Sequence, residues 1–212
     1  VSKLKSESML NISLMHCRYG LSKGNTMNKV LDEYLVAETF EELKIPLVIV
    51  ATDLNSGELV PMGSGDLVKA VQASCSIPFV FVPCKHLGRT LVDGATIDPV
   101  PVKVARDLGA DIVIAVDLCE LLGKTAPTNL FQIVSRSAEI ACMWQNEVST
   151  HTADFIIRPR TYGVGAFNDR KKEEVYLAGK RAAQQQINKI KEAILSKNME
   201  TEIGRASCRE RV

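Results

Sequence analysis

Two kinds of hydrophobic pattern alternate along this chain. Short unbroken runs of apolar, mostly β-branched residues at 47–51 and 112–116 predict strands that are buried on both faces. Elsewhere apolar residues recur at steps of three and four, which is the pattern of helices with one buried face. Helices are predicted at about 25–37, 66–75, 102–108, 128–149 and 170–197. Buried strands that alternate with helices indicate an α/β fold, in which a mostly parallel sheet is covered by helices on both sides.

Turn signals place the remaining strands. Residues 55–57 (NSG) predict a hairpin turn, and Gly88 predicts a second turn between two short strands. The strands flanking these turns, with one more that Pro159 closes, are expected at 58–60, 79–82, 90–92 and 154–157. The chain has neither an internal repeat nor a low-complexity linker, so it predicts one domain.

Composition narrows the function classes. The 212 residues carry a net charge of +1, so no strong electrostatic attraction to nucleic acid or to an anionic membrane is expected. No run of 18 apolar residues predicts a membrane-spanning helix. The six cysteines form no C-x-x-C pair, which is typical of reduced thiols in a cytoplasmic protein. Neither a metal site nor a cofactor is expected.

The last residues depart from these patterns. Residues 202–212 (EIGRASCRERV) fit no helix or strand pattern and resemble the translation of a sequencing adapter, so we expect a non-native tail there. The chain also begins with Val1 rather than methionine. We therefore expect residues 1–201 to form part of one domain, with the chain as a whole being a fragment.

Three acidic residues follow predicted strands: Asp53, Asp93 and Asp117. Sites in α/β sheets lie beyond the carboxyl ends of the strands, so each is a candidate. Asp53 could instead form an Asx-turn in its hairpin, and Asp117 could cap a loop. Asp93 is the best placed, because Gly94 allows a bend or a close approach to a ligand and Ala95 leaves space beside the acid. A carboxylate held in this way is a candidate general base.

The context of Asp93 is more specific than the tripeptide itself. The chain resembles the patatin-like phospholipase family, above all its bacterial branch of small, single-domain members, over about residues 18–197. The resemblance is carried, in order, by residues 73–78 (ASCSIP), 91–95 (LVDGA), 98–101 (DPVP) and 108–117 (LGADIVIAVD). Further similar segments are residues 20–24 (GLSKG), 51–57 (ATDLNSG) and 65–66 (GD).

The resemblance implies a fold and a chemistry. The fold would be a three-layer α/β/α domain, and the activity that of a serine acyl hydrolase with a Ser–Asp dyad acting on lipids or other acyl esters. The family's acid lies in a D-G-G or D-G-A turn, which Asp93, Gly94 and Ala95 match, so Asp93 would be the proton acceptor. Contact with a membrane would be peripheral. Three apolar residues near this acid would either line an acyl pocket or belong to the core: Ile77, Phe79 and Phe81.

The sequence departs from the family in one respect. It contains no G-x-S-x-G turn for the nucleophilic serine and no glycine-rich oxyanion loop. We therefore expect an N-terminally truncated fragment of an esterase, with an incomplete sheet, that is inactive and poorly soluble or molten when expressed alone. Two alternatives stay open: a catalytically dead interaction module, and a nucleotide- or metal-binding α/β protein that uses Asp117. The absence of G-x-G-x-x-G and P-loop motifs disfavours the second alternative.

Overall fold

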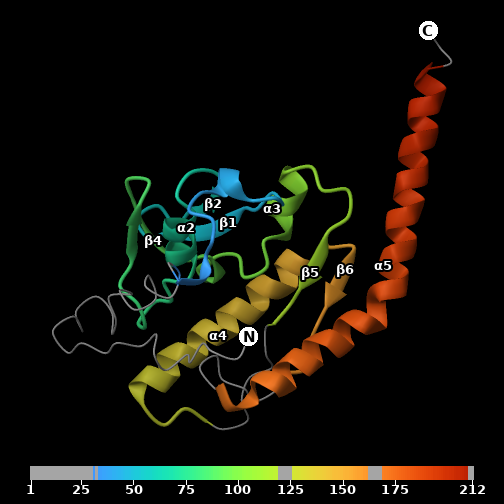
Figure 1. Cartoon of the computed structure of the whole chain (residues 1–212). Helices are drawn as coiled ribbons and strands as arrows, with labels where there is room; N and C mark the ends of the chain where they lie inside the picture. The colour runs from blue at the N-terminus through green and yellow to red at the C-terminus, as the bar shows by residue number, and fades with distance from the viewer. Residues whose placement is uncertain (1–30, 32, 119–125, 162–168, 210–212) are drawn as a thin grey trace.

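The computed structural model describes residues 31, 33–118, 126–161 and 169–209 (Figure 1). The helix predicted at 25–37 lies largely outside the described residues. Leu31, Glu33 and Tyr34 are helical, and the helical structure ends at Tyr34, three residues earlier than predicted.

The larger sheet has four strands in the order β2-β1-β4-β3 and is antiparallel in each pair. Two hairpins build it. The segment around Gly57 joins β1 (Ile49–Asp53) to β2 (Leu59–Met62), as the turn signal predicts. Leu87 and Gly88, with φ of 51° and 71°, form the tight turn between β3 (Cys84–His86) and β4 (Arg89–Asp93). Two successive residues with positive φ are typical of a type I′ hairpin turn.

The smaller sheet is parallel. It pairs β5 (Ile114–Val116) with β6 (Phe155–Ile157), and α4 (Leu130–Thr150) lies between them in the chain. A helix is the usual crossover between parallel strands. The predicted α/β class is thus confirmed, whereas a mostly parallel central sheet is not. The larger described sheet is antiparallel because hairpin turns too short for a crossover connect its strands in pairs.

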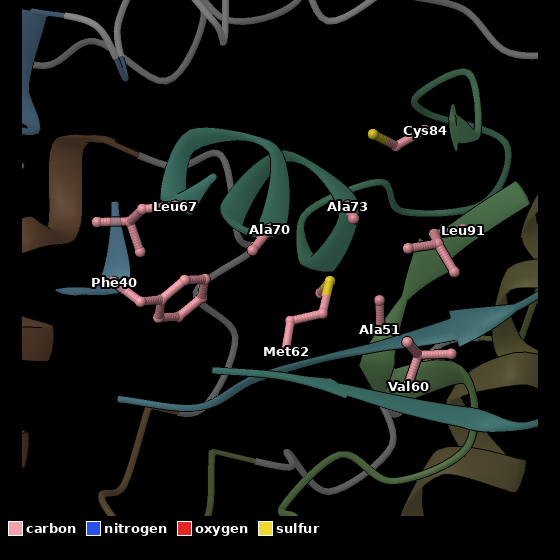
Figure 2. Packing of buried hydrophobic residues seen from close by; sticks show 9 residues of the cluster. All are labelled: Phe40, Ala51, Val60, Met62, Leu67, Ala70, Ala73, Cys84 and Leu91. Carbon is pink, nitrogen blue, oxygen red and sulfur yellow. The ribbon is translucent and has the colours of Figure 1, made fainter. Parts of the chain in front are cut away.

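Helix α2 (Leu67–Ser74) covers one face of the larger sheet (Figure 2). It begins where the Asp66 carboxylate accepts a hydrogen bond from the Lys69 N–H at 2.8 Å, which caps the helix. The core of this layer combines α2 with β1–β4 and the 3₁₀ turn η3 (Phe40–Glu42). Its buried members are Phe40, Ala51, Val60, Met62, Leu67, Ala70, Ala73, Cys84 and Leu91.

The remaining helices follow the predictions closely except at the C-terminal end. Helix α3 spans Val102–Asp107, and α5 spans Lys172–Arg209 after the 3₁₀ turn η5 (Asp169–Lys171). The last helix, predicted at 170–197, continues to Arg209 through residues that fit no helix pattern, because Glu, Ala and Arg favour helix. The last turns of α5 project away from the two sheets (Figure 1). Whether this segment is native remains a prediction.

The two strands predicted to be buried on both faces are only partly so. In the first run Leu47 is exposed and Ala51 is fully buried. In β5 the side chain of Ala115 is buried, whereas Ile114 and Val116 are exposed. The strand predicted at 79–82 is also absent, because residues 78–80 form a turn and Phe81 makes only an isolated β-bridge before β3.

Candidate active site

Asp93 is the last residue of β4 and the N-cap of the 3₁₀ turn η4 (Gly94–Thr96). Its carboxylate accepts a hydrogen bond from the Ala95 N–H at 2.8 Å, so the side chain is tied to its own turn. Its backbone N–H donates to the Ser76 carbonyl at 3.0 Å, and in the ladder it lies opposite Ala51. Asp93 is therefore held by the turn, by β1 and by the segment after α2.

Gly94 is buried against β1. A Cβ at this position would lie 2.6 Å from the Val50 carbonyl oxygen and 2.8 Å from Val50 Cγ2. No side chain fits there without moving the backbone of β1. The sequence predicted a bend or a close approach to a ligand at Gly94, whereas the close approach seen in the structure is to the neighbouring strand. Ala95, by contrast, is exposed.

The environment of Asp93 suits a base. The residue is half-buried, and this burial raises the pKa of its carboxyl group, while the hydrogen bond from Ala95 lowers the pKa in part. A carboxylate with a raised pKa holds a proton more readily near neutral pH than an ordinary one. The local surroundings therefore shift Asp93 in the direction that proton abstraction needs.

Cys75 is a neighbour of Asp93 that the sequence did not single out. It caps the C-terminus of α2 and is exposed by surface area. Burial of its sulfur and then the charge of Asp93 raise the pKa of the thiol, so Cys75 stays protonated and is a poor nucleophile. Only its position one residue before Ser76 could have indicated this proximity.

Asp53 has the structural role that the Asx-turn alternative describes. Its carboxylate accepts hydrogen bonds from the Asn55 N–H at 3.1 Å and from Ser56 Oγ at 3.3 Å. Arg89 also donates to it, at 3.1 Å, and these bonds lower the pKa of Asp53. Asp53 faces Leu91 at the opposite end of the β1–β4 ladder from Asp93.

Asp117 is held in a different cluster. It is buried after β5, where Arg158 Nε donates to its Oδ2 at 2.8 Å and the Asn146 amide donates to its Oδ1. These partners belong to α4 and to the residue after β6, so Asp117 joins the two elements around the small sheet. Within the described part of the chain, then, neither of the other two strand-end acids shares the turn of Asp93.

The apolar residues near Asp93 divide into two groups. Phe81 is buried, whereas Ile77 and Phe79 are exposed. The alternative that they belong to the core thus holds for Phe81 alone. Ser76 is also buried, and its hydroxyl donates to the Gln72 carbonyl at 2.8 Å.

The described residues lack two further features. No helix there is long and apolar enough to cross a bilayer. In the same residues, no group of three or more His, Cys, Asp or Glu side chains is arranged to hold a metal ion. The fold and the site thus define an α/β protein with a half-buried acid on a glycine turn at the end of a strand.

Comparison with known proteins finds a similar family. Residues 8–106 match the family model described as Patatin-like phospholipase, and this match includes Asp93, Gly94 and Ala95. This match covers a little under half of the chain and supports its assignment to the patatin-like phospholipase family.

Several curated proteins are similar to parts of the chain. An uncharacterized NTE family protein of Mycobacterium tuberculosis is 44% identical over 78 residues, which cover 37% of this chain and 22% of that protein. Patatin-like phospholipase domain-containing protein 7 of Mus musculus is 31% identical over 97 residues, covering 45% of this chain and 7% of that protein. A patatin-like phospholipase domain-containing protein of Caenorhabditis elegans is 29% identical over 122 residues, which cover 57% of this chain and 9% of that protein. The matched stretch thus spans about a fifth or less of each of these relatives.

Proposed function

We propose that this chain is part of a lipid acyl hydrolase in which Asp93 is the general base of a Ser–Asp dyad. One observation carries the proposal. The Asp93 carboxylate has a raised pKa and is fixed at a strand end by Ala95, by Ser76 and by the close contact of Gly94 with β1. The match of residues 8–106 to the patatin-like phospholipase model supports the assignment.

The reaction would proceed in two steps. Asp93 takes the hydroxyl proton of the serine as its oxygen attacks the ester carbonyl, and the same proton then passes to the leaving alcohol. The result is an acyl-enzyme. Asp93 next takes a proton from water, whose oxygen attacks the acyl-enzyme, and the returned proton regenerates the serine. The two steps consume one ester and one water and release an alcohol and a carboxylic acid.

The dyad needs a serine that this sequence does not supply in a G-x-S-x-G turn. The relatives are longer than the stretch they share with this chain, which leaves room for such a turn elsewhere in a parent protein. We place the serine and the oxyanion donors there. Without the serine the covalent route is lost, so the chain expressed as printed is expected to be inactive.

The proposed substrates are lipids or other acyl esters. Lipids or other acyl esters suit a dyad of this kind, and the family description names phospholipases. A cytoplasmic enzyme that touches membranes only peripherally agrees with the near-neutral charge of the chain. Asp117 lends no support to nucleotide or metal binding, because Arg158 and Asn146 already bind its two carboxylate oxygens.

The test uses the parent protein that contains this sequence and a G-x-S-x-G turn. Asp93→Asn keeps the size and the Ala95 hydrogen bond but cannot act as a base, so turnover of acyl esters should fall by about 10²–10⁴-fold. Asp107→Asn is the matched control, an exposed aspartate on α3 that should leave turnover unchanged. Full turnover after Asp93→Asn would refute the proposal. A serine-directed phosphonate should abolish activity, whereas a chelator should not.

A further inference from the structure

The segment that follows α2 contacts Asp93 through its backbone and carries two exposed apolar residues just beyond that contact. The Ser76 carbonyl accepts the backbone N–H of Asp93 at 3.0 Å, and Ile77 and Phe79 come one and three residues later. Three residues span at most about 11 Å. Since the segment also turns here, the backbone of Phe79 lies less than this distance from Ser76, the residue that contacts Asp93.

The backbone presents Phe79 in an unfavourable conformation. Its φ of 69° lies in the left-handed region, where a bulky aromatic residue is a rare outlier. Two hydrogen bonds to the Ile77 carbonyl hold the turn, from the Val80 N–H at 3.1 Å and from the Phe81 N–H at 2.9 Å. Phe81, which ends this turn, is buried.

Burial of Phe79 in the core does not compensate for this strain, because the residue is 58% exposed. Glycine would adopt the same φ without strain, yet the sequence has phenylalanine there. Strained backbone next to a catalytic group is a recurrent feature of ligand-binding positions. An exposed aromatic ring of this kind is suited to contact an apolar ligand.

We propose that Phe79, with Ile77 beside it, binds the acyl chain of the substrate and sets a preference for long chains. The inference rests on the proposed function. An ester whose carbonyl lies within reach of the serine beside Asp93 must direct its acyl chain along a neighbouring surface, and residues 77–79 supply an apolar one. Transfer of a long chain from water onto that surface lowers the free energy of the transition state in proportion to the area covered.

The test compares two soluble substrates of the parent protein, p-nitrophenyl butyrate and p-nitrophenyl decanoate, both below their aggregation concentrations. Phe79→Gly removes the ring and relieves the strain, so it should lower kcat/KM for the decanoate about tenfold more than for the butyrate. Phe79→Leu keeps an apolar side chain and should restore most of the preference. Circular dichroism and thermal unfolding establish that both variants are folded.

Leu87→Gly is the matched control. Leu87 is also exposed, at 62%, and also has a positive φ, but it lies in the β3–β4 turn at the far end of β4 from Asp93. The ratio of the two kcat/KM values should not change in this variant.

Three results would overturn the inference. These are no loss of activity on either ester in Phe79→Gly, an equal loss on both esters that leaves the ratio unchanged, or a loss confined to substrate in phosphatidylcholine vesicles, which would indicate membrane contact instead. An inactive parent, or one that stays active after Asp93→Asn, would refute the proposed function and with it this inference. Activity that depends on Asp93 with no effect of chain length would refute this inference alone.

Discussion

Among the glycines of the described residues, Gly94, the neighbour of Asp93, has the least room for a side chain. Because a Cβ there would lie 2.6 Å from a backbone oxygen of β1, the strand must move to admit any side chain. Gly94→Ala should lower the free energy of unfolding by about 1–3 kcal/mol, the usual range for overpacking a tight site. Urea unfolding of the parent protein and of the variant measures the change.

Gly179 provides the matched control for that substitution. It lies inside α5, and a Cβ there meets nothing within 4 Å. Gly179→Ala should raise the free energy of unfolding by up to about 1 kcal/mol, because alanine favours helix over glycine. Equal effects of the two substitutions would contradict the account of Gly94.

The raised pKa of Asp93 makes this residue a source of instability at neutral pH. Protonated Asp93 suits the folded state, so its stabilising contribution is complete below the ordinary carboxyl pKa and is lost as pH rises through the raised pKa. Asp93→Asn should therefore be more stable than the wild type at pH 8, with a smaller difference at pH 4. Urea unfolding at the two pH values tests this. A wild type as stable as the variant at pH 8 would contradict the burial argument.

The sequence predicted Asp93 but not the groups that position it. An acid, a glycine and an alanine after an apolar run form a local signal. Val50 and Ser76, which fix the turn, lie 43 and 17 residues before Asp93, and no periodicity links them to it. Likewise, sequence alone could not divide Ile77, Phe79 and Phe81 between surface and core, since burial depends on elements that are distant in the chain.

At the scale of elements, local signals predicted starts and turns better than burial. The NSG turn, the start of α2 after Asp66 and the end of α3 before Gly109 are each specified by adjacent residues. The predicted two-face burial of β5 failed because an unbroken apolar run does not reveal what covers each face. A mostly parallel sheet was inferred from such runs, whereas hairpin turns decide the direction of β1–β4.

The cap of α2 can be tested separately from the site. Asp66→Ala removes the acceptor for the Lys69 N–H and should lower the free energy of unfolding by about 0.5–2 kcal/mol. Asp107→Ala, which removes an exposed ion pair with Lys103, should change it by less than about 0.5 kcal/mol. Chemical unfolding measures both. A cap variant as stable as the ion-pair variant would show that α2 is held by its packing on the sheet alone.

At the scale of the whole molecule, the two sheets differ in how well the described residues cover them. The larger sheet has α2 and a continuous core on one face. In the smaller sheet, Ile114 and Val116 of β5 are 41% and 52% exposed, and within the described residues β5 pairs with β6 alone. An apolar edge strand of this kind favours pairing with a further strand, from the same protein or from another copy.

Self-association of the chain expressed as printed should therefore depend on β5. Ile114→Lys places a charge on the edge strand and should weaken concentration-dependent association by at least about threefold, as measured by sedimentation velocity. Leu108→Lys is the matched control, since Leu108 is 65% exposed but caps α3, outside the sheet edge. If both substitutions weaken association equally, general hydrophobicity drives it. If neither substitution weakens association, the edge of β5 is already covered in solution. A further strand of the parent protein then does not join the small sheet at that edge.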